Sequence, residues 1–375
     1  MSLRIVVIDD IDQNRSELIS AWAKFDAQNI PSGLELDAIV SWMEKYGRIE
    51  NSRIGYNKQP IIILIYDMDI LLGILPLMRV VRYKKGVMKV TTLEFLTQSF
   101  SGNYLDIIQR SMTAEQVAVV FKLIKKKLRY DMLDFSYLKE NSLLLAAKVG
   151  FNVLHAGKVL IPLCMDYKKI RAEIYSKNLR HILNKFKRRI RESKEVIRSE
   201  IIEGRENIKG IKEAIIQVSL SKLKDQYMHS LYENPILGDL YFDTILKSKK
   251  PFCSVYYSGN QLLSYNLGYI MDDVVYAFDA AYNRNYADSQ KIGLGILAYD
   301  SLVERYAGIY KELDMGFGLD DYKFRFSKKV FFTRSLILKG NTLKAGALYN
   351  KLRKKRLQLE KDTFNRIKKY TGLSK

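Results

Sequence analysis

Apolar runs separated by polar turn segments predict the elements of the second half of the chain. Three runs rich in β-branched and aromatic residues are separated by two short turn segments, and the runs are 252–257, 261–270 and 274–279. Such runs joined by tight turns are typical of antiparallel strands. An apolar run with helical spacing follows at 296–304, and two further strand patterns follow it at 311–317 and 330–338. The pattern therefore predicts three strands, a helix and two more strands.

The first half repeats this kind of order. An amphipathic helix is predicted over 16–25, a strand hairpin over 60–77 with its turn at 67–69, a helix over 113–129 and a strand over 130–135. Further short apolar runs close this half at 151–154 and 159–163. We therefore predict an α/β protein made of two related units, with mixed, mostly antiparallel sheets flanked by helices.

A short glycine-containing stretch lies between the third strand and the helix of the second half. It consists of Gln290, Lys291, Ile292, Gly293, Leu294 and Gly295. Two glycines at a loop-to-helix junction let a phosphate approach the backbone, and the free N–H groups of a first helical turn favour an anion. The alternative is a glycine-containing helix start that binds nothing. The first half has no comparable loop, so a cofactor is expected only in the second half.

Charge is the most unusual global property, with a formal net charge of +21 at pH 7. A basic excess favours anionic partners, such as a nucleotide cofactor, nucleic acid, acidic lipid or an anionic glycan precursor. Two segments are especially rich in lysine and arginine: a predicted helix over 176–191 and a predicted C-terminal helix over 341–375. Either is a solvated helix face or a contact for an anion, and neither has the interleaved aromatic residues of a base-stacking platform. We expect no specific reading of nucleic acid.

Composition narrows the other classes of function. The chain has only three histidines, His155, His181 and His229, and their spacing fits no metal site, so no metal is expected. No run of about 18 uninterrupted apolar residues is present, and the start of the chain lacks the pattern of a signal peptide. We expect a cytoplasmic protein, peripheral to the inner membrane if its basic helices bind lipid.

Domain limits follow from these patterns. We predict an N-terminal unit over 1–168 that has no cofactor, a basic helical linker over 169–235, a catalytic unit over 236–340 and a basic C-terminal helix over 341–375. Within the linker, the segment 192–224 is predicted to continue as a helix with mixed charge.

The order of strands, glycine loop, helix and strands resembles the core of GNAT acyltransferases. More closely, the chain resembles tandem-GNAT acyltransferases typified by the cellulose-biosynthesis acetyltransferase family, relatives of the Fem-type aminoacyltransferases. The resemblance rests on the stretches 61–77, 176–180, 278–282, 289–297 and 314–323, in that order. It implies two tandem GNAT-like domains. The implied reaction transfers an acyl group, expected to be acetyl from acetyl-CoA, to an amine or hydroxyl of a sugar or cell-envelope polysaccharide precursor.

Candidate catalytic residues come from the strand ends near the loop. Acyl transfer from a thioester needs a base for the acceptor, a donor for the oxyanion and an acid for the thiolate. No Ser-His-Asp arrangement or reactive cysteine is evident, which favours direct attack over a covalent intermediate. Asp279 and Asp320 are candidates for the base, and Tyr322 for the acid. Alternatives for these residues are a solvated turn aspartate and a packed tyrosine.

Three further residues are candidates for binding the substrate. Lys323 has the charge to bind an anionic acceptor group or a CoA phosphate, with surface exposure as the alternative. Asp314 lies within a predicted strand, where an aspartate needs a partner. Tyr282 belongs to the stretch 278–282 that carries the resemblance.

Two other functions fit the same features. In one, the donor is aminoacyl-tRNA, as the resemblance to Fem-type enzymes implies, and the basic helices bind the phosphate backbone. In the other, the chain is a non-catalytic protein that docks on polysaccharide-synthesis machinery through its basic helix. The intact set of Gln290, Gly293 and Gly295 favours a catalytic chain.

Overall fold

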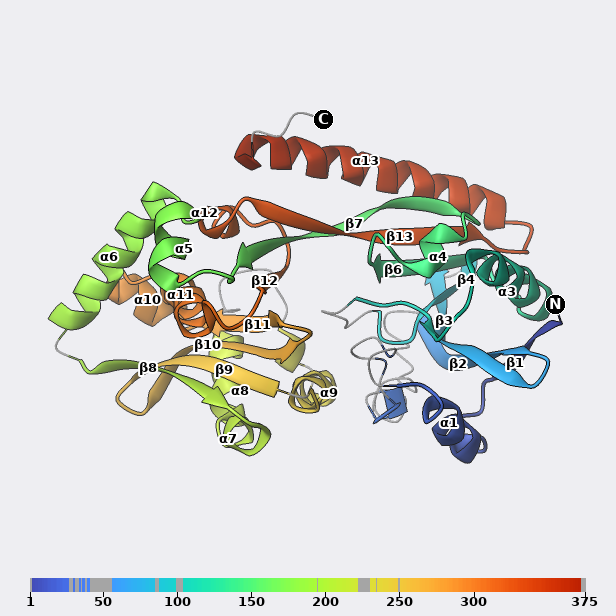
Figure 1. The fold of residues 1–375 in the computed structure, drawn as a ribbon, viewed down its shortest axis with the longest axis horizontal. Coiled ribbons are helices and arrows are strands. Elements are labelled where there is room, and N and C mark those ends of the chain that lie inside the picture. The colour runs from blue at the N-terminus through green and yellow to red at the C-terminus, as the bar shows by residue number, and fades with distance from the viewer. Residues whose placement is uncertain are drawn as a thin grey trace. The chain divides into compact units, whose positions relative to one another are not determined.

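The computed structural model describes most of the chain (Figure 1). The described residues are 2–26, 30, 34, 36–37, 39–40, 56–84, 88–98, 104–193, 195–221, 230–233, 235–248 and 250–371. The chain divides into two compact units. Unit 1 contains Met1–Ala156 and Phe332–Lys375, and unit 2 contains Gly157–Phe331. Each unit is an α/β assembly of strands and helices.

Unit 1 has a mostly antiparallel set of strands. In spatial order they are β1 (Leu3–Ile8), β2 (Tyr56–Asp67), β3 (Ile70–Lys84), β4 (Met88–Phe95), β6 (Met132–Leu138) and β13 (Lys329–Lys339), and β5 (Ile108–Gln109) pairs with β3. The pair β4–β6 is parallel. The helices are α1 (Arg15–Trp22), α3 (Ala114–Lys127), α4 (Leu143–Ala146) and α13 (Ala345–Thr371). The predicted hairpin is thus β2–β3, which turns at Met68 as expected.

The helix α3 shows how the sequence sets these elements. Thr113 caps its first turn, and Gln116 returns a side-chain bond to the backbone of Thr113, which satisfies two N–H groups that a helix start leaves unpaired. Val117, Phe121 and Ile124 are buried at helical spacing, so one face packs on the sheet. The lysines of the last turn lie on the exposed face.

Unit 2 has a second set of strands of the same kind. In spatial order they are β7 (Phe151–Pro162, of which only 157–162 belong to this unit), β12 (Glu312–Phe317), β11 (Val274–Tyr282), β10 (Gln261–Met271), β9 (Lys250–Ser258) and β8 (Ile197–Glu203). Its helices are α5 (Tyr167–Glu173), α6 (Lys177–Glu192), α7 (Arg205–Lys209), α8 (Lys212–Ser221), η2 (Leu231–Glu233), α9 (Pro235–Leu246), α10 (Arg284–Gln290), α11 (Leu294–Tyr306) and α12 (Lys323–Phe326). The three predicted strands are β9, β10 and β11.

The two units repeat one order of elements. Counted from β1 in unit 1 and from β8 in unit 2, the described order is a strand, one or more helices, three antiparallel strands, and then a helix and a strand that runs parallel to the third of those strands, with the short β5 added in unit 1. The parallel pair is β4–β6 in unit 1 and β11–β12 in unit 2. The predicted α/β class with two similar units is therefore confirmed.

The last strand of each half belongs to the other unit. Residues 158–162 of β7, which ends the first half, pair with β12 in unit 2. Residues 334–339 of β13, which ends the second half, pair with β6 in unit 1. The halves defined by sequence thus exchange their final strands, so the contact-based limits differ from the predicted limits at 168, 235 and 340.

The segment 169–235 contains the predicted basic helix, which is α6, but it is more than a linker. The prediction of a helix over 192–224 is wrong for part of this range, because Ile197–Glu203 form β8 and pair with β9. Residues 222–229 lie outside the described part of the chain, as does residue 194. The rest of the segment packs within unit 2.

Candidate functional site

The strands β11 and β12 separate at their carboxyl ends. Their parallel pairs join Val274–Tyr276 to Glu312–Asp314, and Gly316 still lies close to β11, because a Cβ atom on it would be 2.9 Å from the carbonyl oxygen of Ala277. Beyond this point β11 carries a bulge, because Ala277 and Asp279 face consecutive residues of β10 and Phe278 is the extra residue. A bulge bends its strand and leaves local backbone groups out of the ladder. An opening between parallel strands at their carboxyl ends is a common place for a ligand in α/β folds.

Backbone carbonyls at the end of β12 and just after it accept hydrogen bonds from side chains. The Tyr299 hydroxyl donates to the carbonyl of Met315 at 3.2 Å, and Lys323 Nζ donates to the carbonyls of Gly316, Phe317 and Gly318 at 3.1, 2.9 and 3.2 Å. The separation of the two strands is therefore held by bonds from α11 and α12.

The predicted glycine loop lies at the start of α11. Gln290 ends α10, Lys291 has a left-handed backbone, and Gly293 is the N-cap of α11. The N–H of Leu294 donates to the carbonyl of Ile292, and the N–H groups of Ile296 and Leu297 donate to the carbonyl of Gly293. Among the described residues, no acceptor takes the N–H groups of Gly293 and Gly295. The helix dipole adds partial positive charge at this point.

The helix α6 packs against this loop. A Cβ atom on Gly293 would lie 2.5 Å from the ring of Phe186, whereas one on Gly295 would lie 3.3 Å from the ring of Tyr282. Arg189 also donates to the carbonyl of Lys291. The glycine at 293 is thus required by the close approach of α6, a reason that differs from the predicted approach of a phosphate.

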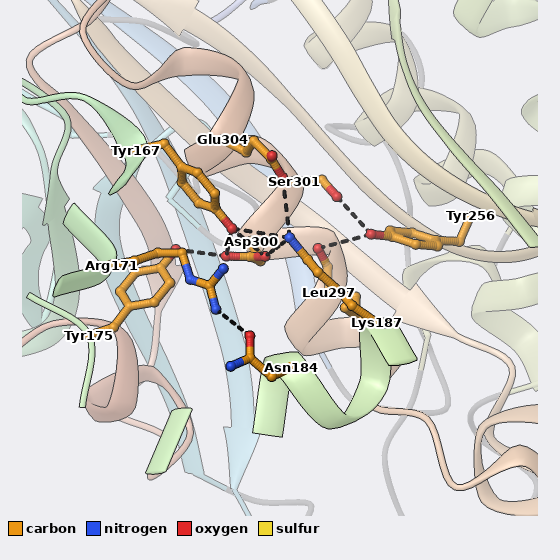
Figure 2. A network of polar contacts seen from close by, with 10 residues as sticks. All are labelled: Tyr167, Arg171, Tyr175, Asn184, Lys187, Tyr256, Leu297, Asp300, Ser301 and Glu304. Carbon is orange, nitrogen blue, oxygen red and sulfur yellow. Dashed lines mark hydrogen bonds and ion pairs between the residues drawn. The ribbon is translucent and has the colours of Figure 1, made fainter. Parts of the chain in front are cut away.

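A buried carboxylate fixes α5 and α6 on α11 (Figure 2). Asp300 is 0% exposed and accepts hydrogen bonds from the hydroxyls of Tyr167, at 2.9 and 3.0 Å, and Tyr175, at 3.2 Å. Lys187 Nζ lies 3.0 Å from it and 3.3 Å from Glu304. Figure 2 shows these side chains converging on Asp300.

The electrostatics of this network are consistent with its hydrogen bonds. Burial and the Asp300 charge raise the pKa of Tyr167 and of Tyr175, so both hydroxyls stay protonated and donate. Burial alone lowers the pKa of Lys187, but the Asp300 carboxylate more than offsets this effect and the pKa is raised. Lys187 therefore remains a cation beside Asp300.

Asp279 lies on the other face of the sheet. Its carboxylate accepts from the hydroxyls of Tyr265 at 2.8 Å and Tyr232 at 3.2 Å. Burial, followed by the Asp279 charge, raises the pKa of both tyrosines, so they act as donors. Asp279 directly follows the bulged residue Phe278, close in the chain to the end of the parallel pairing of β11 with β12.

Tyr282 and Tyr322 lie on the side of α11. Tyr282 is opposite Ser264, whose neighbour on β9 is Tyr256, and the Tyr256 hydroxyl contacts Ser301 of α11 at 2.7 Å. The ring of Tyr322 lies 6.1 Å from that of Tyr299, and burial raises the pKa of Tyr322 to about 12. Tyr282, Tyr322 and the glycine loop are thus brought together, whereas Asp279 approaches from the opposite face.

The remaining predicted residues support β12. Asp314 and Lys158 form an ion pair at 2.7 Å with both side chains at most 2% exposed, and Asp314 also accepts from the N–H of Gly316. Lys323 is 3% exposed, and burial lowers its pKa to about 8. Ligand contact by the Lys323 ammonium would require its bonds to three carbonyls to break. Asp320 is exposed and lies 3.8 Å from Lys323 Nζ.

Sequence reasoning missed Asp300, Lys187 and Lys158. The available signal for Asp300 was an aspartate inside the apolar run behind the glycine loop, where a charge needs a partner. Nothing in the local sequence identifies Lys158 as the partner of Asp314, because the two residues lie far apart in the chain.

Among the described residues, no group of three or more histidines, cysteines or carboxylates could hold a metal ion. Within the same part of the chain, no helix has the length and apolarity needed to cross a membrane.

Similar folds are present among solved structures. A conserved protein of unknown function from Bacteroides thetaiotaomicron has a TM-score of 0.49 and 12% identity, over 90% of this chain and 100% of that one. FemX has a TM-score of 0.49 and 8% identity, over 83% and 92%. A tandem GNAT protein from the clavulanic acid biosynthesis pathway has a TM-score of 0.44 and 8% identity, over 91% and 99%. No family model and no curated protein matches the sequence. No family membership follows from these likenesses.

Proposed function

We propose that unit 2 is an acyltransferase that moves an acyl group, with acetyl as the expected one, from acyl-CoA to an amine or hydroxyl. The observation that carries this proposal is the end of the parallel pairing of β11 with β12, followed by the bulge at Phe278, together with the start of α11, where no acceptor among the described residues takes the N–H groups of Gly293 and Gly295. The arm that carries the thioester in CoA is extended and contains amides, so it suits an opening between strands whose backbone groups are not paired with each other. Its diphosphate suits the amides of Gly293 and Gly295.

In this proposal donor and acceptor approach from opposite faces of the sheet. The donor lies on the side of α11, and the acceptor lies beside Asp279. The acceptor nitrogen or oxygen attacks the thioester carbonyl while Asp279 accepts its proton, directly or through water. A backbone N–H freed by the bulge at Phe278 stabilises the oxyanion, and Tyr322 donates a proton to the leaving thiolate. The bond from carbonyl carbon to sulfur then breaks, and the acylated acceptor and free CoA are released.

The acceptor class comes from the resemblance of the sequence to the cellulose-biosynthesis acetyltransferase family. On that basis we propose a sugar or cell-envelope polysaccharide precursor, handled in the cytoplasm. The net charge of +21 favours an anionic surface or an anionic acceptor near the protein.

Calorimetric titration with acetyl-CoA tests the donor site. Gly295→Asp places a carboxylate at the amides that would hold the diphosphate, and we expect it to weaken binding at least about tenfold through charge repulsion. An acidic residue in the first turn stabilises a helix, so this change should leave α11 intact. Gly295→Asn is the matched control, because it has nearly the same shape without the charge.

Two outcomes would contradict the proposal: no binding of acetyl-CoA by the wild-type chain, or equal binding by the Gly295→Asp and Gly295→Asn variants. Substitutions of Gly293 are unsuitable for this test. A side chain there would displace Phe186 and disturb the packing of α6 whether or not a ligand binds.

A second candidate donor is aminoacyl-tRNA. One observation favours it: α6 exposes Lys185, Arg188 and Arg191 while its Arg189 contacts the glycine loop, so a polyanion bound on α6 would reach the same corner. Retention of tRNA that falls steeply with salt, together with no binding of acetyl-CoA, would support this donor. Failure of both donors to bind would support a non-catalytic role.

A further inference from the structure

Unit 1 contains a polar cavity of about 660 Å³. Its walls come from β2, β3 and β4, from the residues before β6 and from the residues before α13. The lining residues are Asn57, Gln59, Arg79, Val81, Lys89, Thr91, Arg129, Tyr130, Asp131, Thr342, Leu343 and Lys344. This volume lies within the range of about 300–1,000 Å³ that is usual for small-molecule sites.

Strand alternation explains why polar side chains gather on this face. In the register, Gln59 lies opposite Arg79, and Val81 lies opposite both Asn57 and Thr91. Side chains on one strand alternate between faces, so these residues share one side of the sheet. The carboxylate of Glu94 projects from the other face, where it pairs with Arg82 at 2.7 Å. It is therefore not available to neutralise the cavity.

The charge of the cavity is strongly positive. Arg79, Lys89, Arg129 and Lys344 contribute four cations, whereas Asp131 is the lone carboxylate among the lining residues. Asp131 is 1% exposed and already bound: it accepts from the N–H of Thr91 at 2.7 Å and from the Thr342 hydroxyl, and it lies 3.4 Å from Lys344.

The other three cations of the cavity differ from Lys344 in their ion pairing. Within the described part of the chain, Arg79, Lys89 and Arg129 have no ion-pair partner. The Nε of Arg79 is buried and has no hydrogen-bond acceptor there. A buried donor without an acceptor is costly, and a bound oxyanion would remove that cost.

We propose that this cavity binds a small phosphorylated molecule. Three cations without ion-pair partners among the described residues suit the two charges and several acceptor oxygens of a phosphate monoester, and Arg79 provides a directional donor for them. Asn57, Gln59 and Thr91 provide polar groups for the uncharged part of the ligand. The cavity lies at the start of β4 and just before β6, whereas the proposed acyl-transfer site lies in unit 2 at the carboxyl ends of β11 and β12. The inference therefore does not rest on the proposed function.

The test is calorimetric titration of the full chain with inorganic phosphate, glucose 6-phosphate, glucose and citrate. We expect saturable binding of glucose 6-phosphate, weaker binding of phosphate and no binding of glucose. Arg79→Gln should weaken binding at least about tenfold, the usual effect of losing one charge-assisted hydrogen bond. Lys126→Gln is the matched control, because Lys126 is an exposed lysine of α3 that does not line the cavity.

Arg129→Gln is the second variant, because Arg129 is exposed and its replacement should not disturb folding. It should also weaken binding of glucose 6-phosphate. The proposal fails if wild-type protein binds neither phosphorylated probe saturably. It also fails if Lys126→Gln weakens binding as much as Arg79→Gln and Arg129→Gln do, or if citrate binds more tightly than glucose 6-phosphate.

Discussion

The Lys158–Asp314 ion pair is almost completely shielded from water. It lies between β7 and β12 of unit 2, with side-chain exposures of 1% and 2%, and Lys158 Nζ also lies 4.1 Å from the centre of the Phe317 ring. Removing two charges from water costs several kcal/mol each, and the attraction between them offsets this cost only while both are present. Either charge without the other is therefore expected to be strongly destabilising.

Substitution of Lys158 should show how strongly the buried Asp314 charge depends on its partner. Lys158→Met leaves the Asp314 carboxylate buried without its cation and should lower the free energy of unfolding by about 3–5 kcal/mol. The double variant Lys158→Met with Asp314→Leu should be clearly more stable than Lys158→Met alone. Urea denaturation measures both variants, and a double variant no more stable than Lys158→Met would contradict the argument.

His155 provides a pH-dependent contribution in unit 1. Arg356 Nη1 lies 3.1 Å from its Nδ1, and because guanidinium only donates, Nδ1 accepts and the ring is neutral. Burial, followed by the charge of Arg356, lowers the pKa of His155 to about 4, from about 6.5 in the unfolded chain. As pH falls from about 6.5 to 4 the unfolded chain binds this proton first, so stability is lost in that window, by up to about 3 kcal/mol.

Replacing His155 should remove that part of the pH dependence. In His155→Gln, the difference in unfolding free energy between about pH 7 and about pH 4.5 should be smaller than in the wild-type chain. His181→Gln is the control, because His181 is exposed on α6. Urea titrations at several pH values give the comparison, and an unchanged slope in His155→Gln would refute the assignment.

At the scale of elements, α6 is the helix that organises the candidate site. Its Phe186 covers Gly293, its Arg189 bonds to the carbonyl of Lys291, and its Lys187 pairs with Asp300. The strongest of these restraints is expected to be the buried one at Asp300, because Glu304, the other partner of Lys187, is 55% exposed and its pair is screened by solvent.

Asp300→Asn should loosen α6. Asparagine keeps the shape of the side chain but loses the charge that Lys187 and the two tyrosines face, so we expect a loss of about 2–3 kcal/mol in stability. Glu304→Gln, which removes the exposed partner of the same lysine, should cost at most about 0.5 kcal/mol. Trypsin cleavage within the basic helix α6, together with urea denaturation, distinguishes the two variants. Equal effects of Asp300→Asn and Glu304→Gln would contradict the conclusion that Asp300 is the main restraint on α6.

Local pattern predicted some elements and missed others for identifiable reasons. The strands β9 to β11 and the helix α11 were predictable because continuous apolar runs meet clear turn residues. The strand β8 was not, because it pairs along only one edge and none of its residues is buried, which leaves no alternation to detect. Gly293 was noticed for its position, but the helix that requires it lies far earlier in the chain.

At the scale of the whole molecule, the main feature that sequence could not provide is the exchange of final strands. Local periodicity predicts that a strand exists, but not which distant strand it pairs with. The cavity in unit 1 was missed for the same reason, because its cations come from β3, β4 and the segments that precede β6 and α13. The candidate site was located more easily, since its loop, strand ends and helix follow one another in sequence.

The exchange predicts how fragments behave. Separate fragments 1–168 and 169–375 each lack a strand that their sheet requires, so each should be insoluble or poorly folded alone and soluble when the two are produced together. The continuous segment 157–331 keeps the paired residues of every strand of unit 2 and should unfold cooperatively by itself. Solubility and calorimetry of the three fragments decide the matter, and a stably folded 1–168 fragment would be inconsistent with the exchange.

The same exchange determines when the sheet of unit 1 can be completed during translation. Unit 1 begins to leave the ribosome first, yet β13, which completes its sheet beside β6, emerges only when residues 332–339 have been translated. At about 5–20 residues per second, the nascent chain waits for tens of seconds with the edge of β6 uncovered. The N-terminal part of this protein is therefore the portion in greatest need of chaperone protection while translation continues.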